Sequence, residues 1–447
     1  MSAQKKYGNW IYAGFYGGLQ KLSVPLSGLF ITMILAHKTL TKQEMGVWAL
    51  FMTFTAIIEA VRQGMVKTAM IKFYNQDGGA HKFPVVSAAL FLNIATTVFL
   101  SLLMFLFTPF LSIWLKAPQL ANMLYILQAG MLLKIPFSHF EWMMYAKVEF
   151  KGLFWTYFYR QGITLLLVFI AFILGYKLDL NELAIIYNIG LLTGVVVSSR
   201  YVRELIQQSF NFSKNWIIQL FHFGKYVLAN NVSSLVFRSA DQVMLSPILG
   251  TTEFNASQNI AIRFINLTDL PSQTLGDILF PRASQLSNDN TSALKYYYEK
   301  TVGASLVVVI PIITMVMLFP KLIIFVLAGP DYYDAIPYLQ LISVTSIFLA
   351  YLKQFGVLMD STGRPGVNFA ANTSIAVVQV ILLYFCISQF QFIGTGYALV
   401  LSHVFGFIIT QSILYKFFKI NFLRSFKYAY GFVKELPQLL LSRIKKN

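Results

Sequence analysis

The chain has 447 residues, of which 57% are hydrophobic and only 12% are charged, and its mean hydropathy is +0.62. A water-soluble globular protein has about 25% charged residues, so this composition excludes a soluble enzyme or binding domain and indicates an integral membrane protein. The net charge of +17 would also suit a protein that binds nucleic acid, but no soluble module is present to bind it. The chain has a single cysteine, so an intrachain disulfide is excluded.

Runs of about 20 apolar residues predict twelve transmembrane helices and an all-α integral membrane fold. The first run is too long for a signal-peptide core and no small-residue cleavage site follows it, so we expect a retained span. Polar residues interrupt the seventh and eighth runs. The predicted helices are, in order, 11–35, 44–66, 85–107, 112–134, 152–175, 183–206, 219–246, 255–280, 296–319, 337–358, 366–388 and 394–417.

Lysine and arginine fall mainly on one side of these spans. With the N-terminus in the cytoplasm, the inside segments hold 23 of the 35 basic residues and the outside loops hold 5. This asymmetry predicts a multi-pass protein with both termini in the cytoplasm. After the last span, apolar residues alternate with Arg and Lys, which predicts a basic amphipathic cytoplasmic tail over 418–447 that lies on the membrane surface.

The two halves of the chain are similar at an offset of about 209 residues. The segment 40–47 parallels 249–256, and 115–118 parallels 327–330, although chance similarity of apolar segments is an alternative. Six helices in each half give both halves the same orientation, and hence a pseudo-twofold axis along the membrane normal. The predicted parts are an N-terminal six-helix lobe (1–206), a cytoplasmic inter-lobe linker (207–218), a C-terminal six-helix lobe (219–417) and the tail.

Polar side chains within the predicted spans share helix faces. An ionised group at the bilayer centre costs roughly 2.5–3.5 kcal/mol, so such groups must face a bundle interior or water. Successive spacings of three and four residues place each set on one side of its helix. The sets are Asn231, Ser234, Arg238 and Asp241 in the seventh helix, Arg263, Asn266, Asp269, Gln273 and Asp277 in the eighth, and Thr55, Glu59 and Arg62 in the second. The first helix contributes the polar residues Lys21 and Ser23.

Five stretches of the chain stand in a characteristic order and spacing: 40–50 (LTKQEMGVWAL), 240–250 (ADQVMLSPILG), 279–282 (LFPR), 328–335 (AGPDYYDA) and 358–364 (LMDSTGR). Together they resemble a polysaccharide (O-antigen-type) flippase of the multidrug/oligosaccharidyl-lipid/polysaccharide exporter superfamily. One departure is Asn255, where that family usually has a glycine that mirrors Gly46.

This resemblance implies two lobes around a V-shaped cleft lined by the first, second, seventh and eighth helices. It implies a transporter and not an enzyme, which moves undecaprenyl-diphosphate-linked oligosaccharide from the inner to the outer leaflet of the bacterial cytoplasmic membrane by alternating access. The partners implied are this glycan, membrane lipids and the polysaccharide polymerase machinery. No cofactor is expected beyond a coupling H⁺ or Na⁺.

A diphosphate group requires fixed cations and polar donors, for which arginine is well suited. The substrate-binding candidates are therefore Lys21, Arg62, Arg238, Arg263, Asn266 and Gln273. Arg263 and Lys21 have no carboxylate three or four positions away, so they are the leading candidates for diphosphate contact. Pairing with acidic residues on neighbouring helices is their alternative.

Four carboxylates are candidates for ion coupling: Glu59, Asp241, Asp269 and Asp277. Burial can make a carboxylate take up a proton or a sodium ion, but each of these groups could instead only neutralise a basic residue. We expect ion pairs within helices between Arg238 and Asp241, and between Arg62 and Glu59, because each pair is three residues apart. His139 and Glu141 are expected to be interfacial anchors.

Two other functions remain open. A multidrug/cation antiporter of the same fold would favour an apolar, acid-lined pocket, whereas three of the predicted lining helices carry arginine. A membrane O-antigen polymerase would need substantial external loops, whereas most of the predicted outside loops are short. No Walker A sequence, nucleotide-binding loop or metal-spaced His/Cys set is present, so we expect no ATP hydrolysis and no metal site.

Overall fold

The computed structural model describes residues 3–75, 82–206, 213–284, 286 and 291–444, and its regular structure over these ranges is helical. Within them, nine helices are long and apolar enough to cross a membrane, so the all-α, multi-pass prediction is confirmed. Helices α7 and α8 are not among the nine, in keeping with the polar residues that interrupt them. The total of twelve spans therefore stays a prediction.

Each predicted span coincides with a helix, and most of the helices extend several residues beyond the apolar run. A short helix, α10, was not predicted. The helices are α1 (Ala3–Ile34), α2 (Lys42–Tyr74), α3 (Lys82–Trp114), α4 (Pro118–Ala146), α5 (Phe150–Ile173), α6 (Leu180–Ile206), α7 (Lys214–Leu249), α8 (Glu253–Ser284), α9 (Thr291–Leu318), α10 (Pro320–Ala328), α11 (Ala335–Ser361), α12 (Pro365–Phe418) and α13 (Leu423–Ile444), with a π-helical turn η1 (Leu35–Thr39) and a 3-10 turn η3 (Pro330–Tyr332).

The chain forms two compact units. Unit 1 comprises Met1–Leu235 and Gly250–Asn259, and unit 2 comprises Val236–Leu249 and Ile260–Asn447. The chain therefore passes between the units at three points: inside α7 after Leu235, at the end of α7 after Leu249, and inside α8 after Asn259. The predicted lobe boundaries stay predictions, and part of the predicted linker, 207–212, lies outside the described residues.

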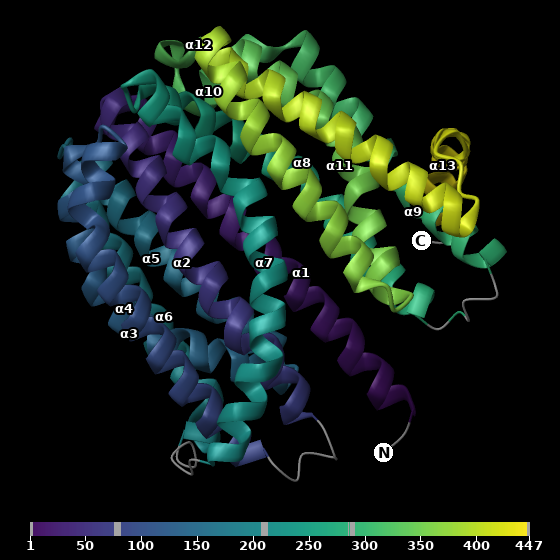
Figure 1. Ribbon diagram of the computed structural model, residues 1–447, viewed down its shortest axis with the longest axis horizontal. Coiled ribbons are helices and arrows are strands. Elements are labelled where there is room, and N and C mark those ends of the chain that lie inside the picture. The colour runs from purple at the N-terminus through teal and green to yellow at the C-terminus, as the bar shows by residue number, and fades with distance from the viewer. Residues whose placement is uncertain (1–2, 76–81, 207–212, 285, 287–290, 445–447) are drawn as a thin grey trace. The chain divides into compact units, whose positions relative to one another are not determined.

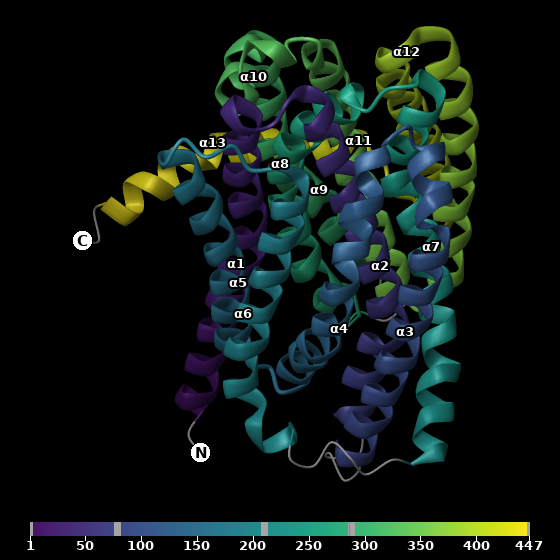
Figure 2. The same cartoon turned by 90° about the vertical axis from the view of Figure 1, so that its left-hand side faces the viewer.

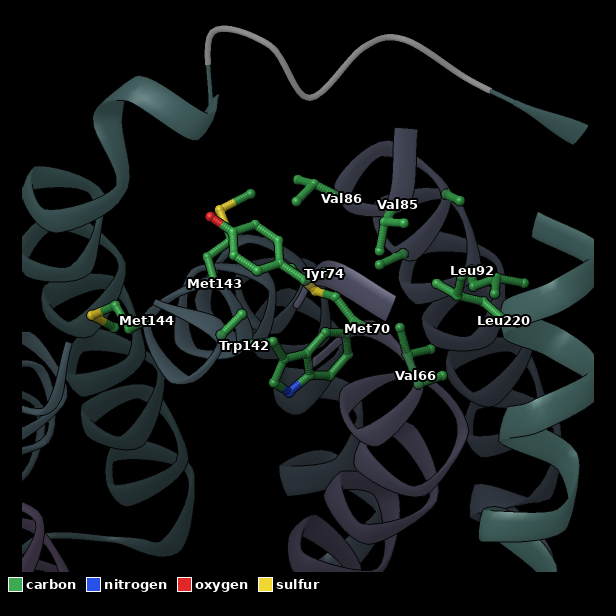
Figure 3. Packing of buried hydrophobic residues seen from close by; sticks show 14 of the residues in the cluster. Val66, Met70, Tyr74, Val85, Val86, Leu92, Trp142, Met143, Met144 and Leu220 are labelled. Atoms are coloured by element: carbon green, nitrogen blue, oxygen red, sulfur yellow. The ribbon is translucent and has the colours of Figure 1, made fainter. Parts of the chain in front are cut away.

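Unit 1 is a bundle in which α1 packs on α5, α5 on α6, α6 on α4, and α2, α3 and α4 on one another. Figure 1 shows these helices in purple and blue, and Figure 2 shows α1, α5 and α6 side by side. At one end of the unit, Val66 and Met70 of α2, Val85 of α3 and Trp142 of α4 belong to one buried apolar cluster (Figure 3). Because lipid is as apolar as these side chains, close packing and not water exclusion must hold them together.

The start of α2 packs directly on the start of α8, within unit 1. Thr41 caps α2 by a capping box with Glu44, whose backbone N–H lies 3.3 Å from the Thr41 hydroxyl. The Thr252 hydroxyl donates to the Gln43 carbonyl at 2.9 Å, and a Cβ added to Gly46 would overlap the Thr252 carbonyl oxygen. Only glycine allows this backbone approach.

Unit 2 is organised around α9 and α11. Helices α11, α12 and α13 pack on α9, and α12 also packs on α11. Tyr298 of α9 and Tyr351 of α11 belong to a second buried cluster, in which the Tyr298 hydroxyl donates to the Tyr351 carbonyl at 3.3 Å.

Helix α12 doubles back on itself near Gln391, whose φ of 54° and ψ of −137° are not helical. A Cβ added to Gly394 would overlap the Cys386 carbonyl, and one added to Gly406 would lie 2.8 Å from the Ile375 side chain. The two arms are therefore antiparallel neighbours, and Figure 1 shows them leaving a common end in yellow-green. They correspond to the predicted helices 366–388 and 394–417.

Gly46→Ala should destabilise the protein by about 1–3 kcal/mol, because the added methyl group must push the backbone at Thr252 away. Thermal unfolding of the purified protein in detergent would measure the loss. Gly162→Ala in α5 is the control, because its Cβ would meet no atom within 4 Å, and it should be neutral or slightly stabilising. Equal stability of the two variants would contradict the close packing at Gly46.

Candidate functional site

The interior of unit 1 holds an arginine whose donors are widely engaged. Arg62 of α2 is 0% exposed, and its Nε donates to the Thr97 hydroxyl at 2.9 Å. Its Nη1 donates to Glu59 at 3.0 Å, and its Nη2 donates to the Asn93 side chain at 2.8 Å and to the Lys134 carbonyl at 2.9 Å. Arg62 therefore ties α2 to α3 and α4, and its side chain is fully enclosed by the protein.

Glu59 is neutralised by the same network. Besides Arg62, its carboxylate lies 3.6 Å from the Lys134 ammonium group and accepts hydrogen bonds from Gln63 at 3.1 Å and Ser138 at 3.2 Å. The expected Arg62–Glu59 ion pair is confirmed. The arrangement supports a structural role for both residues, because a buried ion pair with further hydrogen bonds has little reason to open for a ligand.

A second ion pair and a further cation lie in the same unit. Lys67 of α2 pairs with Glu141 of α4 at 3.3 Å. Arg160 of α5 donates to the Tyr187 hydroxyl at 3.3 Å, and its guanidinium carbon lies 4.7 Å from the ring centre of Phe137. No carboxylate lies within 4 Å of Arg160 among the described residues. Aromatic faces and one hydroxyl therefore surround this cation.

In unit 2, Asp269 of α8 forms an ion pair with Lys353 of α11 and accepts a hydrogen bond from Gln273 at 3.0 Å. Gln354, the next residue of α11, donates to the Ser272 carbonyl of α8 at 3.0 Å. These two links fix α8 beside α11. Asp269 was expected to bind a coupling ion or to neutralise a basic residue, and in this structure it neutralises Lys353.

Arg238 and Asp241 do not form the ion pair that we expected, as judged from the ion pairs of the described side chains. Asp241 is 4% exposed and accepts the backbone N–H of Gln242 at 2.9 Å, whereas Arg238 is exposed. A spacing of three residues permits a contact but does not enforce it, and here the two side chains have different surroundings. Arg238 has no carboxylate within 4 Å in the part of the chain that the structure describes.

The position of Arg238 is nevertheless well defined. The side-chain amide of Gln379 in α12 donates to the carbonyl of Phe237 at 2.9 Å, which holds α7 beside α12. Lys353 is neutralised by Asp269, whereas Arg238 is exposed, so Arg238 is the cation of this region that an anionic ligand can reach.

The remaining candidates are placed as follows. Arg263 of α8 is half-buried, and Asn266 and Gln273 of the same helix are exposed. Lys21 of α1 is exposed in unit 1. The side chain of Asp277 lies outside the described residues. The proposed roles of these residues in binding and coupling stay predictions.

Sequence reasoning missed Lys134 and Lys353 as partners of acidic residues. The available signal was a lone lysine inside an otherwise apolar span, since such a charge requires a partner on another helix. His139 and Glu141 are buried in unit 1. Their expected position as interfacial anchors is therefore wrong, and Glu141 instead binds Lys67.

Residues 34–337, more than half of the chain, match the family model described as "Polysaccharide biosynthesis protein". An uncharacterized membrane protein of Methanocaldococcus jannaschii is 27% identical over 217 residues, 48% of this chain and 42% of the relative. A protein of Haloferax volcanii named a probable low-salt glycan biosynthesis flippase is 24% identical over 249 residues, 54% of this chain and 51% of the relative. The matched regions thus span about half of these relatives or less.

The fold also has a solved counterpart. The structure titled lipid II flippase MurJ, inward closed conformation, superposes with a TM-score of 0.76 and covers 96% of this chain and 92% of that one. The two sequences are 14% identical, so this likeness shows the fold alone.

Arg62→Gln should destabilise the protein by about 3–5 kcal/mol, because it breaks a buried ion pair and leaves Asn93 and Thr97 without their donor. Thermal unfolding without any ligand would measure this loss, with the exposed Arg203→Gln of α6 as the charge-matched control. A stable Arg62→Gln protein that had lost only ligand binding would instead identify Arg62 as a substrate contact.

Proposed function

Because this chain belongs to the polysaccharide biosynthesis protein family, we propose that it moves a lipid-linked oligosaccharide across the membrane. In its finer form, the substrate is undecaprenyl-diphosphate-linked oligosaccharide, which passes from the inner to the outer leaflet of a bacterial cytoplasmic membrane by alternating access. Both termini then lie in the cytoplasm, in keeping with the distribution of Lys and Arg. The name of the Haloferax volcanii relative, a glycan biosynthesis flippase, supports this proposal. The proposal also includes an association of this protein with the polysaccharide polymerase machinery.

The observation that carries the proposal is the exposed guanidinium of Arg238 within α7. In a membrane protein such a group must face water or a ligand, because contact with lipid is too costly. Lys353 is neutralised by Asp269, whereas Arg238 has no acidic neighbour within 4 Å among the described residues. A diphosphate supplies the missing negative charge.

The other substrate-binding candidates have matching roles in this proposal. Arg238 contacts the diphosphate as a bidentate donor, and Arg263 is a second cation for the same group. Asn266 and Gln273 are suited to sugar hydroxyls, since an amide can both donate and accept. Arg62 is not part of this contact set, because all of it is buried in its own network.

Ion coupling enters the proposal through Asp269. Its carboxylate binds Lys353, so a coupling cation would compete with that ammonium group for the same oxygens. Such competition would link ion binding to the arrangement of α8 and α11.

A multidrug/cation antiporter is the second candidate. A cationic drug would meet the exposed guanidinium of Arg238, and like charges in a site of low dielectric constant disfavour binding. Arg238 therefore distinguishes the candidates, since it favours an anionic substrate and opposes a cationic one.

Arg238→Gln should weaken binding of a polyprenyl-diphosphate oligosaccharide about ten- to a hundredfold, the range expected when a charge-assisted hydrogen bond is lost. Displacement of a labelled polyprenyl diphosphate from the protein in lipid nanodiscs would measure it. Lys321→Gln in α10 is the control, because this exposed lysine lies away from α7 and α8 in sequence. Tighter binding of a cationic dye than of the diphosphate to the unaltered protein would refute the flippase assignment.

Asp269→Asn and Lys353→Gln should change ion coupling in opposite directions. The first removes the carboxylate, so transport should lose its dependence on Na⁺ or on pH, whereas the second removes the competing cation and should raise the apparent affinity for the ion about tenfold. Transfer of a labelled polyprenyl-diphosphate oligosaccharide between the leaflets of proteoliposomes, at graded Na⁺ concentration and pH, would show both effects. Unchanged ion dependence in both variants would exclude Asp269 from coupling.

A further inference from the structure

A groove of about 570 Å³ lies between α9 and α13, in unit 2 and in a part of the chain that the transport proposal does not use. Aromatic and basic side chains form most of its wall, together with one carboxylate. The lining residues are Tyr296 and Lys300 of α9, and Arg424, Lys427, Tyr428, Gly431, Phe432 and Glu435 of α13.

Helix α13 is firmly seated on α9 beside this groove. A Cβ added to Gly303 of α9 would lie 2.8 Å from the Ser425 carbonyl oxygen and 2.8 Å from the Tyr428 Cβ. Ser425 and Ala429 are buried, and α13 belongs to the same apolar cluster as α9 and α11 through Ala429. One face of α13 is therefore occupied by this packing, and the groove is a fixed feature of unit 2.

The groove carries more positive than negative charge. Lys300, Arg424 and Lys427 line the groove together with one carboxylate, Glu435, and a second carboxylate, Glu299, lies near Arg424 outside the lining. None of the three cations forms an ion pair among the described residues. Lys300 donates to the Tyr296 hydroxyl at 2.9 Å, which holds its ammonium group at the wall of the groove. Three cations that converge on one hollow are suited to a phosphate group.

A different face of α13 is apolar and exposed. Leu423, Phe426, Tyr430 and Val433 are spaced three, four and three residues apart, so they form one stripe, and Tyr430 is 73% exposed. In a multi-pass membrane protein, a helix with an exposed apolar stripe beside a basic face lies at the boundary between lipid tails and headgroups. The groove then opens at the depth of the lipid phosphates.

We propose that the groove between α9 and α13 binds the headgroup of an anionic phospholipid. Lys300, Arg424 and Lys427 hold the phosphate, and the apolar stripe of α13 lies among the acyl chains of the same leaflet. The charge of the groove selects the occupant, because a zwitterionic lipid offers no net negative charge to three converging cations. The site is separate from the residues assigned to substrate and coupling ion.

Native mass spectrometry of the full-length protein with phosphatidylglycerol or phosphatidylcholine tests this proposal. The triple variant Lys300→Gln, Arg424→Gln and Lys427→Gln should weaken retention of phosphatidylglycerol at least about tenfold, given that each basic group near an anionic lipid contributes about fivefold. A control triple variant with the same loss of charge, Lys416→Gln, Lys419→Gln and Lys434→Gln, should stay within about twofold of the unaltered protein, because these residues do not line the groove. Retention of phosphatidylcholine should be weak throughout.

A second variant leaves the charges in place. A Cβ added to Gly431 meets no atom within 4 Å, so Gly431→Leu projects into open space at the groove and should block the lipid without disturbing the fold. If the triple variant does not fold, the loss of lipid retention by Gly431→Leu tests the proposed site instead. Three results would overturn the proposal: equal losses in the two triple variants, full retention by Gly431→Leu, or displacement of the lipid by glycerol phosphate at an equal concentration, which would identify a site for a free phosphate compound.

Discussion

An ionised side chain inside a membrane protein must be neutralised by partners or kept in water, and the arrangement of both units follows from that constraint. In unit 1 it takes the form of a closed network. Arg62 reaches acceptors on α2, α3 and α4, and Glu59 is held between Arg62 and Lys134. Three helices are thereby held at fixed distances, because moving any of them would leave a buried charge without its partner.

The two units use their charges differently. Glu59 and Glu141 of unit 1 both bind cations on the same or neighbouring helices, which gives that unit a rigid interior. Unit 2 has the ion pair of Asp269 with Lys353, but it also presents Arg238 on an exposed face, with no carboxylate within 4 Å among the described residues. Unit 1 thus keeps these charges within closed contacts, whereas unit 2 leaves one guanidinium open to a ligand.

Local sequence pattern was sufficient to locate most of the helices. Each apolar run coincides with a helix, and Gln391, the non-helical residue inside α12, lies in the predicted gap between 388 and 394. Partner choice could not be predicted, because it depends on which helices adjoin. Lys134 and Lys353 are far in sequence from Glu59 and Asp269, and the spacing of Arg238 and Asp241 says nothing about the different burial of their side chains.

The contact between the starts of α2 and α8 has a consequence for how the chain can vary. Gln43 and Thr252, which share a hydrogen bond, are 209 residues apart in sequence. The Thr252 carbonyl occupies the space that a Cβ at position 46 would need, so the residue type at position 46 is set by a segment that is distant in the sequence. A larger residue at position 46 is compatible with the fold only if the backbone at Thr252 moves away with it.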